Sequence, residues 1–149
     1  MEVDYSKVPQ VKLSYVDEVC NDRLKVRYPH EGVEVFRECF KECMQHHEEI
    51  YIMYLNCSNR VLGLLCVGKG TIDSTLGNIK AIAQGAILSN ASKVMIAHNH
   101  PSGNKEPSNA DKTLTAKLND MFRLLEIRFL DHFIITYDGY LSFSEEGLL

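Results

Sequence analysis

Apolar and polar positions along the chain change their spacing several times, and each change marks an expected element. From Val33, apolar residues recur every three or four positions with Glu and Lys between them, which predicts a helix that ends near His46 or His47. Two apolar runs follow, from Ile50 to Leu55 and from Val61 to Val67, and a short polar segment separates them. The turn-forming residues between these runs predict an antiparallel hairpin.

The second half of the chain alternates between helical and extended patterns. Leu76 begins an apolar stripe at helical spacing that runs to Ile87, and a second stripe follows Asp111. A buried strand is expected between the two helices, from Val94 to Ala97. A further strand is expected to start at Arg128, and two extended runs then flank an Asp-Gly pair that favours a hairpin turn. Helices between strands, with hairpins at both ends, predict the α/β class, with a mixed β-sheet flanked by helices.

Residues 1–32 have the weakest pattern. They are expected to form an N-terminal extension packed on a core domain of residues 33–149. Within the extension, Val11 to Val16 alternates as an edge strand does, and Tyr28-Pro29-His30-Glu31-Gly32 is typical of a turn.

Composition narrows the class of protein. A chain of 149 residues suits one domain, and a net charge of -4 argues against charge-driven binding to nucleic acid. The first residues lack the pattern of a signal peptide, and no apolar stretch approaches the roughly 20 residues that span a bilayer, so we expect a cytoplasmic protein without membrane contact. The five Cys include no C-x-x-C pair. Cys39 and Cys43 lie at helical spacing among apolar residues, which favours buried reduced thiols over zinc ligands or disulfides.

The segment that follows the Val94–Ala97 strand carries the candidate chemistry. His98 and His100 are two residues apart on extended chain and therefore point to the same side. A Pro and a Gly then end the strand, and Ser108-x-x-Asp111 opens the next helix in the manner of a capping box. Two imidazoles and a carboxylate that converge on one point form the ligand set of an open zinc site, in which water takes the fourth position.

A hydrolytic zinc site also needs a proton acceptor that is not itself a ligand. Glu48 and Glu49 stand directly before the Ile50 strand and are the candidates. Two His and a carboxylate also form the facial set of mononuclear iron oxygenases, but the His-x-Asp spacing usual there is absent, so this alternative ranks last. His132 is expected either to orient a ligand or to make a structural hydrogen bond. His46 and His47 lack a matching acid and are expected at a solvated helix end.

These residues resemble a known signature. His98-Asn99-His100-Pro101-Ser102-Gly103, followed by Pro107-Ser108 and Asp111, is similar to the JAMM (MPN-type) metalloprotease motif in the form that RadC-family proteins carry. The similarity continues through Leu130-Asp131-His132-Phe133 to the end of the chain and covers roughly residues 33–149. It implies a cytidine-deaminase-like α/β core of the MPN (JAB) type.

The resemblance also implies roles for individual residues. It implies that His98, His100 and Asp111 hold zinc and that Ser108 assists the tetrahedral intermediate. It implies a catalytic Glu at the head of the first core strand. Counting back from Leu55-Asn56 places it at Glu48, with Glu49 as the runner-up.

One departure from the family pattern is visible. Many relatives have Pro-Arg-Glu at the start of the helix before the motif, whereas this chain has Ile79-Lys80-Ala81. The contribution of that Arg-Glu pair is therefore not carried over to this chain.

The function expected from these residues is that of a zinc-dependent hydrolase, a metallopeptidase or isopeptidase acting on a peptide or protein substrate. The alternative is a DNA-repair or mobile-element accessory protein with a structural or vestigial zinc site. A single zinc with a general base suits carbonyl hydrolysis better than phosphodiester cleavage, which commonly recruits two metals. The sequence leaves the oligomeric state open.

Overall fold

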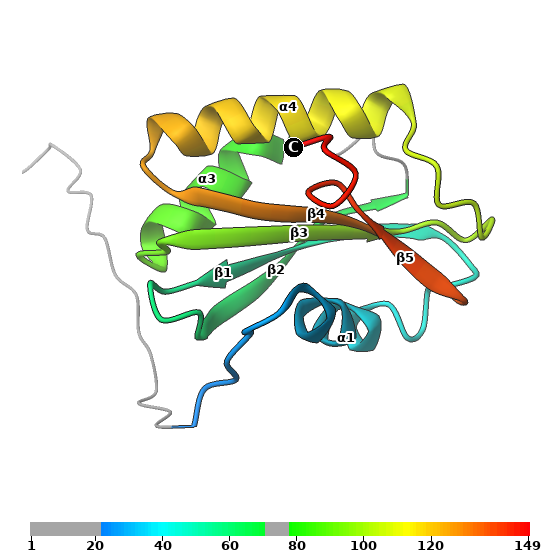
Figure 1. Cartoon of the computed structure of the whole chain (residues 1–149), viewed down its shortest axis with the longest axis horizontal. Helices are drawn as coiled ribbons and strands as arrows, with labels where there is room; N and C mark the ends of the chain where they lie inside the picture. The colour runs from blue at the N-terminus through cyan, green and yellow to red at the C-terminus, as the bar shows by residue number, and fades with distance from the viewer. Residues whose placement is uncertain (1–21, 71–77) are drawn as a thin grey trace, which may run out of the picture.

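The centre of the fold is a five-stranded mixed sheet with the strand order β2-β1-β3-β4-β5. The computed structural model describes residues 22–70 and 78–149. Its elements are α1 (Pro29–Cys39), β1 (Glu48–Leu55), β2 (Val61–Gly70), α3 (Ile79–Leu88), β3 (Lys93–Asn99), α4 (Asn109–Leu124), β4 (Arg128–Thr136) and β5 (Gly139–Ser142). Helices α3 and α4 cover one face of the sheet and α1 covers the other (Figure 1). The predicted α/β class and mixed sheet flanked by helices are confirmed.

The strand pairing follows from the connections. Strands β1 and β2 form an antiparallel hairpin, as do β4 and β5, so both predicted hairpins are confirmed. Strand β3 pairs antiparallel with β1 and parallel with β4, and α4 makes the crossover that a parallel pair requires. The end of β3, the start of β1 and the start of α4 therefore lie at one end of the molecule, on the right in Figure 1.

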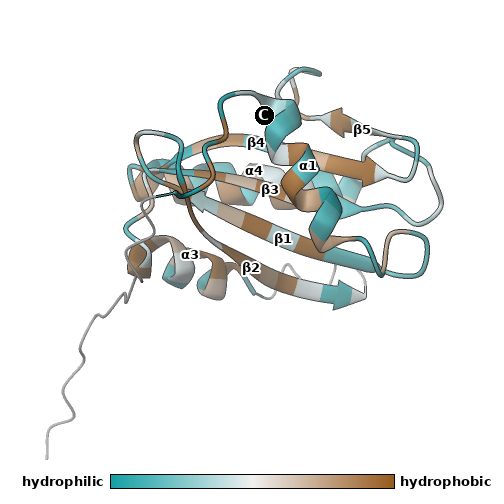
Figure 2. Cartoon of the chain, turned by 90° about the horizontal axis from the view of Figure 1, so that it is seen from below, coloured by the Kyte–Doolittle hydropathy of each residue, from teal (hydrophilic) through white to brown (hydrophobic). Residues whose placement is uncertain are grey.

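Alternation along the central strands builds two separate hydrophobic cores. Ile52 and Ile96 belong to the core beneath α3 and α4, whereas Met53 and Met95 belong to the core beneath α1. The strands are largely hydrophobic along their length and the connecting loops largely hydrophilic (Figure 2). Because neighbouring residues on a strand serve opposite cores, the face of each side chain can be read from the register.

The first helix differs from the sequence prediction at both ends. It begins at Pro29, four residues before Val33, and ends at Cys39, after which turns continue to His46. The prediction of a turn over residues 28–32 is therefore wrong. Pro29 occupies the first helical position, where its missing N–H costs no hydrogen bond, and Glu31 accepts a hydrogen bond from the Tyr28 N–H at 3.3 Å.

Two further expectations concern residues outside the described ranges. The edge strand at Val11–Val16 lies there, and so does Leu76, while α3 begins at Ile79. The division into an extension of residues 1–32 and a core of 33–149 stays a prediction. None of the helices in the described ranges is long and apolar enough to cross a membrane.

Candidate metal centre

The register of β3 fixes the face on which the first imidazole lies. His98 pairs with Ile50 of β1 and with Ile134 of β4, and its side chain is fully buried on the α3/α4 side of the sheet. His100 follows two residues later, where its N–H still donates to Ile135 O at 3.0 Å. Gly103 then reverses the chain, with φ of 81° and an N–H that donates to His100 O.

Asp111 reaches the same point from the first turn of α4. Ser108 is the N-cap, and its Oγ accepts a hydrogen bond from the Asp111 N–H at 3.1 Å. In return, Asp111 Oδ2 accepts from the Ser108 N–H at 2.6 Å. The other carboxylate oxygen, Oδ1, is buried and has no hydrogen-bond partner. Asp111 therefore completes the capping box with one oxygen and leaves the other free for a cation.

The three side chains converge as a tetrahedral ligand set requires. His98 Nε2 lies 2.9 Å from His100 Nε2 and 3.1 Å from Asp111 Oδ1. His100 Nε2 lies 3.7 Å from Asp111 Oδ2. Zinc bonds of about 2.0 Å at tetrahedral angles separate ligand atoms by about 3.3 Å, and the two distances from His98 Nε2 are close to this value. The distance from His100 is to Oδ2, the oxygen that also accepts from the Ser108 N–H. The structure thus brings together the three residues that the sequence suggested as ligands.

A chain of hydrogen bonds sets the proton on His98. The Thr115 hydroxyl donates to Asp111 O at 2.8 Å, so its oxygen can only accept from His132 Nδ1 at 2.6 Å. His132 Nε2 then carries a lone pair and accepts from His98 Nδ1 at 2.8 Å. This network assigns the proton of His98 to Nδ1 and leaves Nε2 with a free lone pair.

His100 is also held with its proton on Nδ1. Its Nδ1 donates to Asn104 O at 2.6 Å, which leaves the Nε2 lone pair free. Two lone pairs that face each other at 2.9 Å repel unless a cation lies between them. Together with the unpartnered Asp111 Oδ1, this arrangement fits a divalent metal ion.

Burial and neighbouring groups shift the pKa values of the cluster. Burial lowers the pKa of His98 despite the opposing charge of Asp111, and burial lowers the pKa of His132 well below its ordinary value. Burial by itself would raise the pKa of Asp111, but the His98 ring and the Ser108 N–H outweigh it and hold that pKa below its usual range. Neutral imidazoles and an ionised carboxylate are the forms that bind metal.

Thr115 is a residue that the sequence did not single out. Its only signal is its position four residues after Asp111, on the same side of α4. His132 was expected just before a strand, but it lies within β4, where Phe143 stacks on its ring at a centroid distance of 4.5 Å. The hydrogen bonds from His98 and to Thr115 favour the ligand-orienting interpretation of His132 over a purely structural one.

We expect Thr115→Val to weaken metal binding at this centre by about 10–100-fold, the usual cost of losing a group that orients a ligand. Val keeps the shape of Thr but cannot accept a hydrogen bond from His132. The ring nitrogen that carries the proton is then no longer fixed in His132 or in His98. A zinc titration against a competing chelator measures the change. Thr113→Val, which alters an exposed hydroxyl on the same helix, is the control. Equal zinc affinity in the two variants would contradict the role given to Thr115.

The sheet separates the two candidate proton acceptors. Glu48 lies two residues before Ile50, the partner of His98, so its side chain points to the same face as His98. The charge of Glu48 acts on the pKa of His98, which agrees with this placement. Glu49 lies on the opposite face, where His47 and Tyr51 bind its carboxylate. Of the two acids, only Glu48 is on the side of the metal centre.

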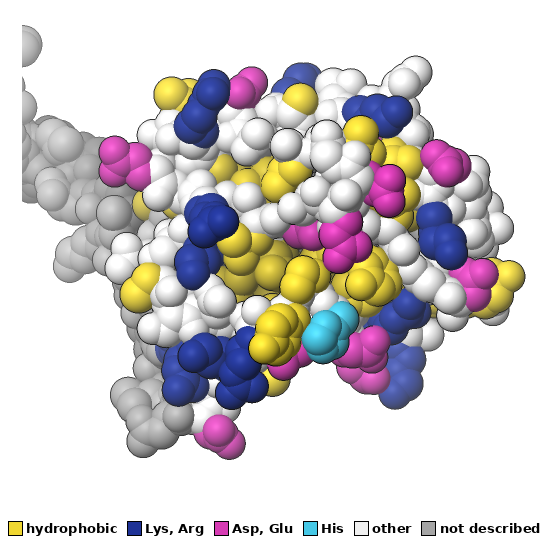
Figure 3. Space-filling view, viewed as in Figure 1, with side chains coloured by type: hydrophobic (Ala, Val, Ile, Leu, Met, Phe, Trp, Pro, Cys, Tyr) yellow, Lys and Arg dark blue, Asp and Glu magenta, His cyan; other side chains and the backbone are white. Residues whose placement is uncertain are grey.

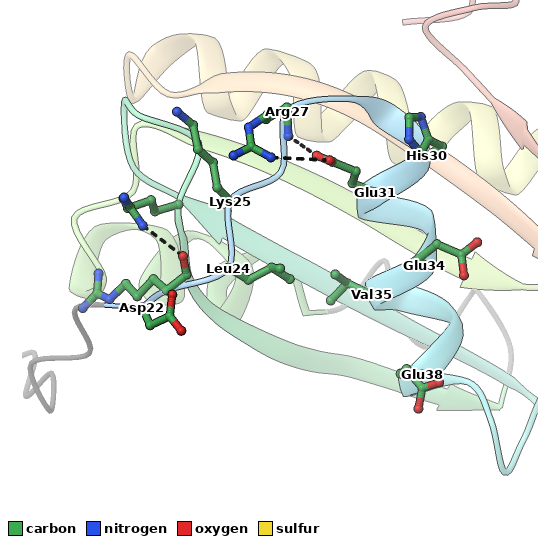
Figure 4. Close-up of a pocket in the computed structure, with 11 residues that line it drawn as sticks. Asp22, Leu24, Lys25, Arg27, His30, Glu31, Glu34, Val35 and Glu38 are labelled. Carbon is green, nitrogen blue, oxygen red and sulfur yellow. Dashed lines mark hydrogen bonds and ion pairs between the residues drawn. The ribbon is translucent and has the colours of Figure 1, made fainter.

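A surface pocket lies away from the candidate metal centre. It has a volume of about 840 Å³ and lies between α1 and the segment before it. In Figure 4, Leu24 and Val35 point toward each other across it, and Arg27 reaches Glu31. Basic side chains gather near this corner, at the lower left of Figure 3, and acidic ones are scattered over the rest of that face. None of the candidate ligands lines this pocket.

Comparison with known proteins agrees with the geometry. A family model described as RadC-like JAB domain matches residues 26–148. A protein of Flavobacterium johnsoniae named UPF0758 protein is 37% identical over 102 residues, which cover 68% of this chain and 44% of the relative. UPF0758 proteins of Aquifex aeolicus and Ectopseudomonas mendocina are 36% and 37% identical over 85% of this chain, and the matches cover 54% and 57% of those relatives. The chain thus spans about half the length of these relatives, and the resemblance seen in the sequence is confirmed.

Proposed function

The chain belongs to the RadC-like JAB domain family, and from this premise and the geometry of the candidate metal centre we propose that it is a zinc-dependent hydrolase. The proposed substrate is a peptide or protein, and the proposed reaction is hydrolysis of a peptide or isopeptide bond. The observation that carries the proposal is the buried, unpartnered Asp111 Oδ1 beside two imidazole lone pairs. His98, His100 and Asp111 would hold the ion.

The donor set favours catalytic over structural zinc. Two nitrogens and one oxygen are typical of sites that leave the fourth position to water, whereas structural sites are usually closed by four protein ligands with several Cys. When bound, zinc would acidify a water molecule and polarise the substrate carbonyl.

Glu48 is the proposed general base. It is half-buried at the start of β1, on the same face as His98, and it is not part of the ligand set. Its carboxylate would take the proton of the attacking water and later deliver it to the leaving amine. A carboxylate can do both because it accepts and releases a proton within one turnover.

Ser108 is the proposed donor to the oxyanion. Its Oγ accepts from the Asp111 N–H, so the hydroxyl hydrogen is available to a group outside the cap. The capping geometry fixes this hydroxyl next to Asp111. Ser108 would thereby steady the negative charge that develops on the carbonyl oxygen.

Hydrolysis of a peptide mixture, followed by mass spectrometry, tests the proposal. We expect cleavage by the zinc-loaded protein, loss of cleavage after chelation and recovery when zinc is returned. Ser108→Ala should lower the rate by about 10²–10³, the usual cost of one oxyanion donor, while Ser58→Ala in the β1–β2 turn should not. Cleavage that persists after complete removal of metal would overturn the proposal.

A further inference from the structure

A second group of metal-binding side chains lies on the opposite face of the sheet. The Cys43 thiol, a ring nitrogen of His47 and a carboxylate oxygen of Glu49 all lie within 4.8 Å of one another. Cys43 is 3% exposed and Glu49 is 5% exposed, whereas the side chain of His47 is 41% exposed. Two of the three side chains are therefore buried, and solvent reaches the group at His47.

Local geometry brings these residues together. The chain forms turns between α1 and β1, and the His47 N–H donates to Cys43 O at 3.2 Å, as in one turn of a helix. Residues four apart in such a turn face the same side, which places the thiol and the imidazole together. Glu49 then points to this face because it alternates with Glu48 on β1.

A buried amide fixes this arrangement. Asn99 lies between His98 and His100 and faces the other way. Its Nδ2 lies within hydrogen-bond distance of Cys43 O at 3.2 Å and of His47 O at 2.8 Å. Its Oδ1 accepts from the Glu49 N–H at 2.8 Å. One side chain thus holds the backbone of all three residues of the group.

The carboxylate of Glu49 is the centre of the group. Its Oε1 lies 2.8 Å from His47 Nε2 and 3.1 Å from Lys69 Nζ, and its Oε2 accepts from the Tyr51 hydroxyl at 3.1 Å. A hollow of about 600 Å³ surrounds these side chains and gives access to solvent. Thiolate, imidazole and carboxylate together are the donors that zinc prefers, and water from the hollow can complete a tetrahedron.

We propose that Cys43, His47 and Glu49 form a second binding site for zinc or a similar divalent transition ion, on the face of the sheet opposite the His98 centre. The sequence argued against it, because Cys43 was expected as a buried reduced thiol and His47 as a solvated residue without a matching acid. Lys69 neutralises Glu49 when no ion is bound and competes with the ion. Its side chain is 66% exposed and can move into solvent.

The two sites share the start of β1. Glu48 faces the His98 centre and Glu49 faces the second site, and Asn99 links both to the end of β3. An ion bound to Glu49 therefore anchors the strand end that carries Glu48. The second site would in this way stabilise the position of the proposed general base.

Cobalt substitution tests the second site separately from the first. Co²⁺ bound by a thiolate gives a sulfur-to-metal charge-transfer band in the near ultraviolet, and the His98 centre contains no sulfur ligand. We expect the chelator-treated full chain to bind two Co²⁺ and to show this band. His47→Ala, which changes a partly exposed side chain, should bind one Co²⁺ and lose the band, and Cys43→Ser should do the same.

One control and one further variant complete the experiment. Cys57→Ser removes an exposed thiol and should leave the band intact. Lys69→Met removes the competing cation and should tighten Co²⁺ binding by up to about fivefold, the size expected from losing a largely exposed ion pair. Far-ultraviolet circular dichroism confirms that each variant is folded. A folded parent without the band, or a band that survives Cys43→Ser, would overturn the second site and leave the His98 centre untouched.

Discussion

Glu48→Gln is expected to remove nearly all peptide hydrolysis while the protein still binds zinc at the His98 centre. Gln has the shape of Glu but cannot take a proton from water, and general bases usually contribute about 10²–10⁴ in rate. Glu48 is outside the ligand set, so zinc binding should stay close to that of the parent. Initial rates on a cleaved peptide, measured beside the zinc content of each preparation, check both parts of the expectation.

Glu49→Gln is the matched comparison, because it makes the same change at the next residue. Its side chain faces the other side of the sheet, so the loss of turnover should be much smaller than for Glu48→Gln. A Glu48→Gln protein as active as the parent would show that the base is wrongly assigned. A larger loss in Glu49→Gln would move the assignment to Glu49.

The ligand set of the His98 centre could be predicted from sequence because its signals are local. Strand alternation relates His98 to His100, and a helix N-terminus orients Asp111. These rules act over a few residues and hold in the structure. Capping and metal binding by Asp111 are compatible, because each uses a different carboxylate oxygen.

The surroundings of the centre could not be predicted in the same way because they depend on tertiary contacts. His132 meets His98 only because β3 and β4 are adjacent and parallel, and Thr115 meets His132 only because α4 crosses over them. His47 was expected at a solvated helix end without a matching acid. Glu49 provides one because Asn99 of β3 ties the turn to β1. Sequence spacing alone does not say which strands and helices lie next to each other.

The start of α1 shows a different limit. Hydrophobic periodicity begins at Val33, because the preceding turn of the helix contributes few side chains to the core. The chain nevertheless becomes helical at Pro29, where backbone geometry and the Glu31 contact to the Tyr28 N–H are enough. Periodicity detects which residues are buried, and capping residues are needed to detect where a helix starts.

Asp111→Asn is expected to abolish tight zinc binding at the His98 centre without unfolding the protein. The Asn oxygen can still accept from the Ser108 N–H, so the cap remains. Its amide group replaces Oδ1 and can donate to the His98 lone pair, which satisfies both buried atoms without an ion. The metal affinity should fall by more than the roughly 10–100-fold typical of residues that only orient a ligand.

A chelator competition titration in a His47→Ala background isolates this centre, because the proposed second site is then disabled. Thermal unfolding of the metal-free proteins should show that Asp111→Asn still folds cooperatively, since the cap is kept and the Asn amide can donate to His98 Nε2. Asp120→Asn, at an exposed position of the same helix, is the control and should keep parental zinc affinity. Tight zinc binding by Asp111→Asn would show that the carboxylate serves only as a helix cap. The proposed zinc site would then lack its third protein ligand, which would contradict the hydrolytic proposal.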